Sequence, residues 1–336
     1  MRRIYAVLAL ALLLAGCETS PRRTTGSSGG GGGGSTGGQL YVSTPSSILR
    51  FSNAESSNGN VAPVATITGG QISSPQHLFL DTAADRLYVA NQGGSSVLVF
   101  DNASQMTGTT PPTRVISGNA TTLVAPIDVA VDTSNNLLYV ADGTSIRVFA
   151  SASTILGNTP PVRNINMGIS IGGLFLDAAR NQLYVSDPGD NAVDRLDGAS
   201  TQDVVGIVGG AIAGQNTGLA RPRGLVLDTA GRLIVSNSTT PSITVYPSAG
   251  TATGDVIPVA NIIGPQTNLQ SPGQMALNSN AFSGELYVVE TLGGSVLIFT
   301  NMSTATGPVP PTRSIKGANT GLTANAVNGL AIDPTR

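Results

Sequence analysis

The sequence predicts an all-β fold, a six-bladed β-propeller with four-stranded blades in which the C-terminal strand closes the ring within the first blade. Three observations lead to this prediction. A short apolar segment ending in Asp or Asn recurs six times. A Leu-Tyr-Val segment recurs about every 50 residues, a few residues after the apolar segment. The repeats are offset at the two ends of the chain. Four short strands in a unit of this length are typical of a propeller blade.

The first strand of each repeat is apolar along its length, as expected for a strand that is buried on both faces. It occurs at residues 78–81, 129–132, 174–177, 225–228, 275–278 and 330–333. An Asp ends five of these copies and precedes a turn, as in the segment 81–85. We interpret these residues as turn formers rather than ligands: Asp81, Asp132, Asp177, Asp228 and Asp333.

Shorter sequence patterns mark the other three strands of the repeat. The second reads Leu-Tyr-Val at 40–42, 87–89, 138–140, 183–185 and 286–288, and Leu-Ile-Val at 233–235. The third ends in an aromatic residue in five repeats and in Leu196 in the fourth repeat. The fourth is centred on Ile67, Ile116, Ile165, Ile207, Ile262 and Ile315. Proline pairs precede three of the fourth strands, which suits an outer edge because proline cannot donate to a neighbouring strand.

The offset of the repeats predicts the closure of the ring. The folded region begins with a second strand near residue 40 and ends just after a first strand at residue 333, so the two fragments together complete a sixth blade. An open repeat array would expose both fragments and would require polar caps, which the sequence lacks. An open array or another number of blades remains the alternative.

The N-terminus predicts export and a membrane anchor. Residues 1–16 combine a basic start, a short apolar run and small residues, which is typical of a signal peptide. Leu14-Ala15-Gly16-Cys17 resembles the lipobox of bacterial lipoproteins, which implies a lipid on Cys17; an ordinary signal peptide that contains a cysteine is the alternative. In enteric bacteria an Asp after the lipidated cysteine resembles a signal for retention at the inner membrane. Because Glu18 follows Cys17 here, we expect the protein at the outer membrane. Residues 17–38 form a flexible Gly/Ser-rich tether and residues 39–336 the propeller.

The composition argues against nucleic acid as a partner. Cleavage after residue 16 would remove Arg2 and Arg3 and leave 15 basic against 19 acidic side chains. Nucleic-acid-binding proteins usually carry a basic face instead. We expect a monomer that meets the membrane through its lipid and binds a protein or a small molecule at the channel face of the propeller.

The repeats resemble those of NHL-repeat propellers. The matching segments are 126–132 (Pro-Ile-Asp-Val-Ala-Val-Asp), 138–142 (Leu-Tyr-Val-Ala-Asp) and 146–149 (Ile-Arg-Val-Phe), and the resemblance extends over residues 40–333. It implies the propeller architecture. Relatives of this fold include protein- and RNA-binding scaffolds as well as lactonases and lyases, so the resemblance by itself does not select an activity.

Two sets of loops should surround one mouth of the central channel, which is the usual place for a small ligand in such a fold. The loops after the second strands offer Asn91, Asp142, Asp187, Asn237 and Glu290. The junctions before the first strands offer Gln76, His77, Asp128, Arg223, Gln274 and Asn328. The simpler interpretation of the Asp and Asn residues is that they brace tight turns by accepting backbone hydrogen bonds.

No cofactor is expected from this set, and calcium is the alternative. Asp128, Asp142, Asp187 and Glu290 are the carboxylates that could hold such a hard cation. Resemblance to lactonase-type propellers would make that metal catalytic. The hypotheses are therefore a non-enzymatic binding module, a metal-dependent hydrolase, and a surface adhesion protein that binds along its side.

The sequence offers few residues for catalysis or metal binding by histidine. His77 is the only histidine, no nucleophile elbow is present, and zinc sites built from His and Cys are excluded in residues 39–336 by count. We interpret His77 as a polar residue at the channel mouth and expect no enzymatic activity. Three arginines recur near the proline pairs and should lie on outer strands, solvated or bonded to a neighbouring loop: Arg114, Arg163 and Arg313.

Overall fold

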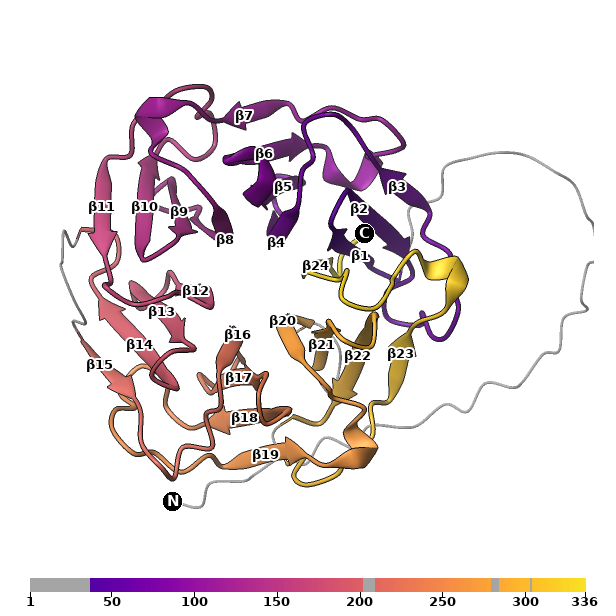
Figure 1. Ribbon diagram of the computed structural model, residues 1–336, viewed down its shortest axis with the longest axis vertical. Coiled ribbons are helices and arrows are strands. Elements are labelled where there is room, and N and C mark those ends of the chain that lie inside the picture. Colours follow the sequence, from indigo (N-terminus) through magenta and orange to yellow (C-terminus); the bar gives the residue numbers. More distant parts are fainter. Residues whose placement is uncertain (1–36, 202–208, 279–283, 303) are drawn as a thin grey trace, which may run out of the picture. The chain divides into compact units, whose positions relative to one another are not determined.

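A computed structural model describes residues 37–201, 209–278, 284–302 and 304–336. These residues form six antiparallel sheets of four strands, arranged as the blades of a β-propeller around a central axis (Figure 1). The predicted fold class is confirmed. The predicted signal peptide, Cys17 and all but the last two residues of the predicted tether lie outside the described residues.

The four strands of each blade lie side by side, from the innermost strand at the channel to the outermost strand of the ring. Blade 1 consists of β24 (Gly329–Asp333), β1 (Gln39–Thr44), β2 (Ser47–Ser52) and β3 (Ala65–Ile67). Blade 2 consists of β4 (Pro75–Asp81), β5 (Arg86–Asn91), β6 (Ser96–Asp101) and β7 (Arg114–Ile116). Blade 3 consists of β8 (Pro126–Asp132), β9 (Leu137–Asp142), β10 (Ser145–Ala150) and β11 (Arg163–Asn166).

The second half of the ring follows the same order. Blade 4 consists of β12 (Gly173–Asp177), β13 (Gln182–Asp187), β14 (Ala192–Asp197) and β15 (Gly209–Ile212). Blade 5 consists of β16 (Pro222–Leu227), β17 (Leu233–Asn237), β18 (Ser242–Tyr246) and β19 (Ala260–Ile263). Blade 6 consists of β20 (Pro272–Asn278), β21 (Glu285–Glu290), β22 (Ser295–Thr300) and β23 (Arg313–Ile315).

Short 3-10 helices occur in the loops at Gln92–Gly94, Ala103–Gln105, Asn119–Thr121, Pro265–Thr267 and Ala318–Thr320. Within the residues that the structure describes, no helix has the length and apolar character needed to cross a bilayer.

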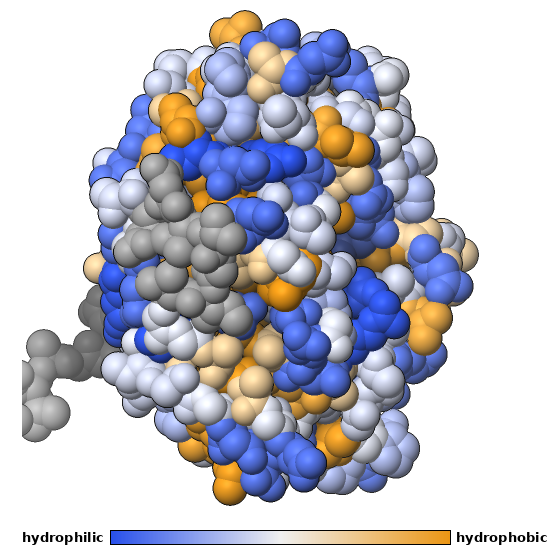
Figure 2. All heavy atoms as spheres, turned by 60° about the vertical axis from the view of Figure 1, so that its left-hand side comes forward, coloured by the Kyte–Doolittle hydropathy of each residue, from blue (hydrophilic) through white to orange (hydrophobic). Residues whose placement is uncertain are grey.

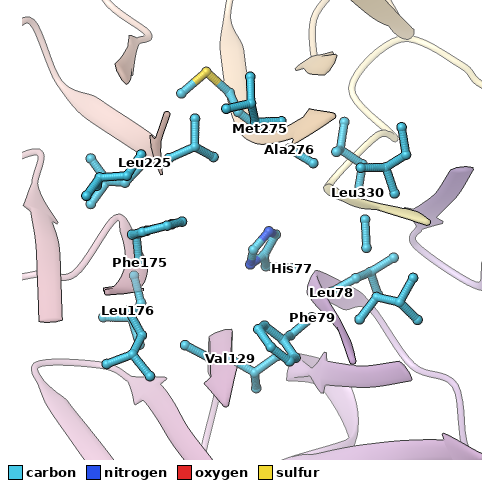
Figure 3. A pocket seen from close by; sticks show the side chains of 18 of the residues that line it. His77, Leu78, Phe79, Val129, Phe175, Leu176, Leu225, Met275, Ala276 and Leu330 are labelled. Carbon is cyan, nitrogen blue, oxygen red and sulfur yellow. The ribbon is translucent and has the colours of Figure 1, made fainter. Parts of the chain in front are cut away.

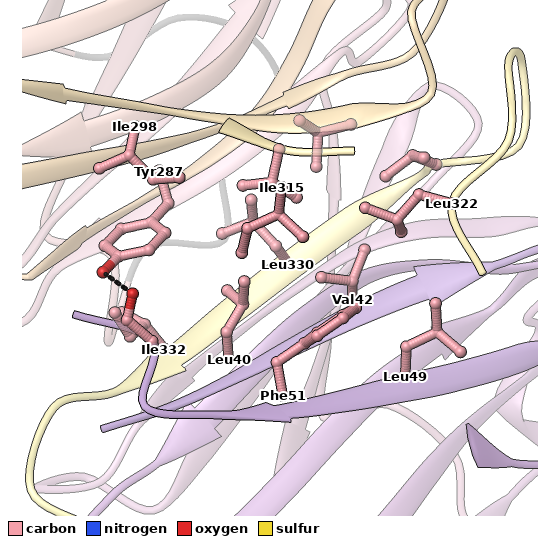
Figure 4. Close-up of a cluster of buried hydrophobic side chains, with 14 residues drawn as sticks. Leu40, Val42, Leu49, Phe51, Tyr287, Ile298, Ile315, Leu322, Leu330 and Ile332 are labelled. Atoms are coloured by element: carbon pink, nitrogen blue, oxygen red, sulfur yellow. Dashed lines mark hydrogen bonds between the residues drawn. The ribbon is translucent and has the colours of Figure 1, made fainter. Parts of the chain in front are cut away.

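The ring closes as the offset of the repeats predicts. β24 pairs antiparallel with β1, from Gln39 opposite Asp333 to Ser43 opposite Gly329, so strands from the two ends of the described chain share blade 1 (Figure 1). The hydrophobic core lies in the seams between neighbouring blades. At the closing seam, Leu40, Val42 and Phe51 of blade 1 pack against Tyr287 and Ile298 of blade 6 (Figure 4).

The predicted outer arginines connect neighbouring blades instead of pointing into solvent. Arg114 donates to the carbonyl oxygen of Ala152 in blade 3 at 3.2 Å, and Arg313 donates to that of Ala54 in blade 1 at 2.7 Å. Arg163 bonds in the same way to blade 4. Of the two outcomes that the sequence left open, the bond to a neighbouring loop is therefore the one observed.

The fourth strand of blade 4 differs from its prediction. Ile212 of β15 lies opposite Val193, which is the place that Ile116 occupies opposite Val97 in blade 2. Ile207, the predicted centre of this strand, lies outside the described residues. Pairing with β14 places Gly209–Ile212 in the described strand, although its two glycines have low β-propensity.

Candidate binding site in the central channel

One layer of the channel is formed by corresponding residues of the six innermost strands. These residues, which we call the polar layer, are His77, Asp128, Gly173, Gly224, Gln274 and Gly329. Three blades thus contribute a polar side chain to the layer, and the other three contribute none.

The three glycines are required by the close approach of neighbouring strands. A Cβ atom on Gly173 would lie 2.5 Å from the carbonyl oxygen of Arg223, and one on Gly329 would lie 2.6 Å from that of Gln76. The Cβ on Gly173 would also lie 3.0 Å from the amide nitrogen of Gln274 and 3.3 Å from Oδ2 of Asp128. Glycine therefore leaves the space through which Asp128 and Gln274 meet across the channel.

Asp128 is fully buried, and hydrogen bonds from four groups satisfy its carboxylate. Oδ1 accepts from its own neighbour Val129 N at 2.7 Å and from Nδ1 of His77. Oδ2 accepts from Leu174 N at 2.8 Å and from Nε2 of Gln274 at 3.2 Å. Because these donors belong to blades 2, 3, 4 and 6, the side chain connects the inner strands of four blades.

His77 projects into the middle of the channel (Figure 3), and its side chain keeps 14% exposure. Among the described residues, Asp128 is its hydrogen-bond partner, through Nδ1. The other ring nitrogen, Nε2, has no hydrogen-bond partner among the described residues. Asp128 fixes the orientation of the ring, but the described residues place no hydroxyl or thiol in hydrogen bond with Nε2, so a catalytic triad is not assembled at this position.

A polar pocket of about 300 Å³ lies on the side of the polar layer where the innermost strands begin; we call it the mouth pocket. Its lining includes five residues that the sequence singled out: Gln76, His77, Arg223, Gln274 and Asn328. Arg221 joins Arg223 there, and no Asp or Glu belongs to the described lining. Desolvation and the charge of Arg221 lower the pKa of Arg223, and within the described residues neither arginine side chain forms an ion pair.

The five candidates at the ends of the second strands do not line this pocket. Four of them accept hydrogen bonds from the loop that leads into the innermost strand of their own blade. Asn91 accepts from Ser73 N at 2.7 Å, Asp142 from Ala125 N at 2.6 Å, and Asn237 from Ala220 N at 3.0 Å. Glu290 accepts from Gln270 N and Ser271 N, and burial raises its pKa.

Asp187 differs slightly from these four residues, because it accepts from Gly189 N at 2.8 Å in its own loop. In all five cases the side chain braces a loop, which is the simpler of the two interpretations that the sequence allowed.

The structure does not bring the four candidate metal ligands together. Asp128 reaches into the polar layer, whereas Asp142, Asp187 and Glu290 are held by loop amides. In the described ranges no cluster of three or more His, Cys, Asp or Glu side chains is arranged to hold a metal ion. The donor set that calcium prefers is therefore not assembled by these residues.

A second cavity, which we call the chamber, lies on the other side of the polar layer. It has a volume of about 400 Å³, and the innermost strands of all six blades line it with apolar side chains (Figure 3). Sequence reasoning missed the chamber because it considered polar side chains in loops. The signal was present in the first strands themselves, which are apolar on both faces.

The outer side of the propeller offers no comparable apolar site among the described residues. Large apolar side chains that remain exposed are distributed over different blades, and Figure 2 shows apolar patches separated by polar residues on the side in view. Val64, Val162 and Val259 each immediately precede the outermost strand of a different blade. Isolated exposed residues of this kind are normal on a protein surface.

Comparison of the structure with solved proteins supports the fold. A chain of a crystallised nidogen/laminin complex matches with a TM-score of 0.61 and 15% identity, over 88% of this chain and 98% of that one. A protein of unknown function from Bacteroides caccae matches with a TM-score of 0.60 and 8% identity, over 88% and 98%. A functionally unknown protein from Desulfotomaculum acetoxidans matches with a TM-score of 0.56 and 13% identity, over 82% and 79%.

No protein-family model matches the chain, and no curated protein matches its sequence. At these identities the solved structures establish the six-bladed propeller and leave function to the chemistry of the site.

Proposed function

We propose that this chain is a lipid-anchored binding module of the bacterial envelope. In this proposal, residues 1–16 direct export, Cys17 carries the lipid, and residues 18–38 tether an NHL-like propeller that acts as a monomer at the outer membrane. The order of basic, apolar and small residues before Cys17 supports the anchor. A tether of about 21 residues would give the propeller a reach of roughly 25 Å from the membrane.

The mouth pocket carries the proposal of binding. Arg221 and Arg223 bring two positive charges to a pocket whose described lining has no carboxylate, and the amides of Gln76, Gln274 and Asn328 add hydrogen-bonding groups. Guanidinium groups bind carboxylates and phosphates in pairs of parallel hydrogen bonds. The partner is therefore a protein or a small molecule that presents an anionic group to the mouth. The similarity to a propeller crystallised in a nidogen/laminin complex is consistent with a protein partner.

The hydrolase hypothesis receives no comparable support. Asp142, Asp187 and Glu290 are occupied by loop amides, and Asp128 is saturated by its four donors. These carboxylates would have to give up buried hydrogen bonds before they could bind a cation or activate water, at a cost of about 1–3 kcal/mol for each bond.

A photo-cross-linking experiment in the native bacterium tests the mouth. A photoreactive amino acid at position 292 would lie beside Thr291 of the mouth pocket, and one at position 257 would lie on the outer side; Leu292 and Ile257 are 47% and 69% exposed. We expect an adduct from position 292 and none from position 257. The adduct should disappear when Arg221→Ser and Arg223→Ser are introduced. An adduct that forms only at position 257, or one indifferent to the arginines, would contradict the proposal.

The anchor is tested separately. Cells that grow with an alkyne-labelled fatty acid should label the wild-type protein and not Cys17→Ser, and the variant should leave the membrane fraction. A labelled Cys17→Ser protein would show that the lipid is not on Cys17. An unlabelled Cys17→Ser protein that still sediments with the outer membrane would show that the lipid is not what anchors the protein.

A further inference from the structure

We propose that the chamber binds a compact, uncharged and mainly apolar small molecule that carries one hydrogen-bond donor. The polar layer lies between the chamber and the mouth pocket: His77 belongs to both linings, Gln274 lines only the mouth pocket, and the buried Asp128 lines neither. The inference therefore does not rest on the proposed function at the mouth.

The wall of the chamber is suited to an apolar molecule. Five large apolar side chains of the innermost strands are partly exposed in it: Phe79, Phe175, Leu176, Leu227 and Leu277. A volume of about 400 Å³ lies within the range of ligand pockets. Water is held poorly in such a space because it finds few partners, and comparable apolar cavities accept apolar ligands.

The charges and the depth of the chamber further restrict the class of ligand that it can bind. Apart from His77, its lining holds one ionisable side chain, Asp228, and this carboxylate already accepts from Nε of Arg232 at 2.6 Å. A charged ligand would find no free counter-ion among the described lining residues. The lining takes three or four residues from five of the innermost strands and two from β8, a depth of about 10–13 Å at 3.3 Å per residue. A molecule of two or three aromatic rings fits this depth.

His77 provides the polar contact at the inner end. Its Nδ1 is bonded to Asp128, so in the neutral ring Nδ1 carries the proton and Nε2 is an acceptor. A hydroxyl or N–H group on the ligand can donate to Nε2. The expected ligand thus has an apolar body against Phe79 and Phe175 and one donor directed at His77 (Figure 3).

N-phenyl-1-naphthylamine is a suitable probe, because it is uncharged and apolar, carries one N–H group and fluoresces strongly in apolar surroundings. Titration of the purified protein should give saturable fluorescence with one site per chain. Ala276→Phe should weaken the binding about tenfold or more, because it places a large side chain in the chamber, in a layer where two other blades already carry Phe79 and Phe175. Ala84→Phe, in an exposed turn, is the matched control and should leave the binding unchanged.

Three further measurements keep the test decisive. If Ala276→Phe does not fold, as judged by circular dichroism, Ala331→Leu fills the chamber from blade 1 instead. His77→Leu should weaken the binding of 1-naphthol, measured by competition with the fluorescent probe, about three- to tenfold. It should leave the binding of naphthalene unchanged, as expected for one lost hydrogen bond. Arg223→Ser should have no effect on the binding of the probe in the chamber. Fluorescence that does not saturate, that survives the chamber-filling variants, or that is lost in Arg223→Ser would overturn the proposal, and the last result would assign the probe to the mouth pocket.

Discussion

The polar layer and the chamber are formed by neighbouring residues of the same six strands, yet they differ in space and in chemistry. In the polar layer, half of the positions are glycine because neighbouring strands approach too closely for a Cβ atom. Two residues further along, the strands carry a mixture of small and large apolar side chains around an open cavity: Phe79, Ala130, Phe175, Val226, Ala276 and Ala331.

This difference separates two tasks that a channel has to perform. Asp128, His77 and Gln274 hold the inner strands in fixed positions through directed hydrogen bonds, which require short distances and filled space. The chamber has neither, since its side chains leave about 400 Å³ free. Rigid contacts at one end of a strand and free volume at the other allow a ligand to enter without loss of the ring.

The largest expected effect on stability tests the difference in free space between the polar layer and the chamber. Gly173→Val should destabilise the protein by about 3 kcal/mol or more, because its side chain would collide with the backbone of blade 5. Ala276→Val, in the chamber, should change the stability by less than about 1 kcal/mol, since Val226 already occupies the corresponding position of blade 5. Urea unfolding of both variants measures the contrast. Equal losses would mean that the two layers are packed alike.

A somewhat smaller effect tests the difference in chemistry. Asp128→Ala should cost about 2–4 kcal/mol, because it removes the buried acceptor of the Val129 and Leu174 N–H groups and of the His77 ring. Thermal unfolding of the purified variant gives the value. The control is Asp81→Ala, where the carboxylate accepts one exposed backbone bond, and its loss should stay below about 1 kcal/mol. Similar losses in both variants would indicate that Asp128 braces only its own strand.

The comparison also shows what the sequence could predict. The blade count, the closure at β24 and the strands other than the fourth strand of blade 4 follow from periodicity and are found where they were expected, because a buried repeat must keep its apolar pattern. In the structure His77, Asp128 and Gln274 lie in the polar layer, and Arg223 and Asn328 line the mouth pocket. Their grouping into a layer and a pocket depends on distances across the ring, which one blade does not encode.

The arginines that connect the blades illustrate the same limit. In blades 2, 3 and 6 the arginine lies on the outermost strand, where the sequence identified it. In blades 1 and 4 it lies directly opposite, on the third strand, as Arg50 opposite Ala65 and Arg195 opposite Gly210. Both bond to the next blade, Arg50 to Ser104 and Arg195 to Ala252. A comparison of repeats by position in the sequence misses this exchange, whereas cross-strand pairing makes the two positions neighbours.

The smallest expected effect concerns a carboxylate that lacks what the polar layer provides. Asp194 in β14 is 1% exposed, and its Oδ2 has no hydrogen-bond partner among the described residues. Burial, together with the charges of Asp187 and Asp190, raises the pKa of Asp194 to about 6. Blades 1, 2 and 6 carry leucine at the corresponding positions, namely Leu49, Leu98 and Leu297.

The raised pKa determines the sign of the pH effect. The folded protein holds a proton on Asp194 more tightly than the unfolded chain does, so the stability falls as the pH rises from about 4 to about 6 and is then constant. Asp194→Asn should remove this dependence and increase the stability at pH 7.5 by about 1–2 kcal/mol, with no gain at pH 4. Urea unfolding at the two pH values measures it, with Asp81→Asn as the control. A loss of stability at pH 7.5 would mean that Asp194 has a charged partner, and the contrast with Asp128 would then fail.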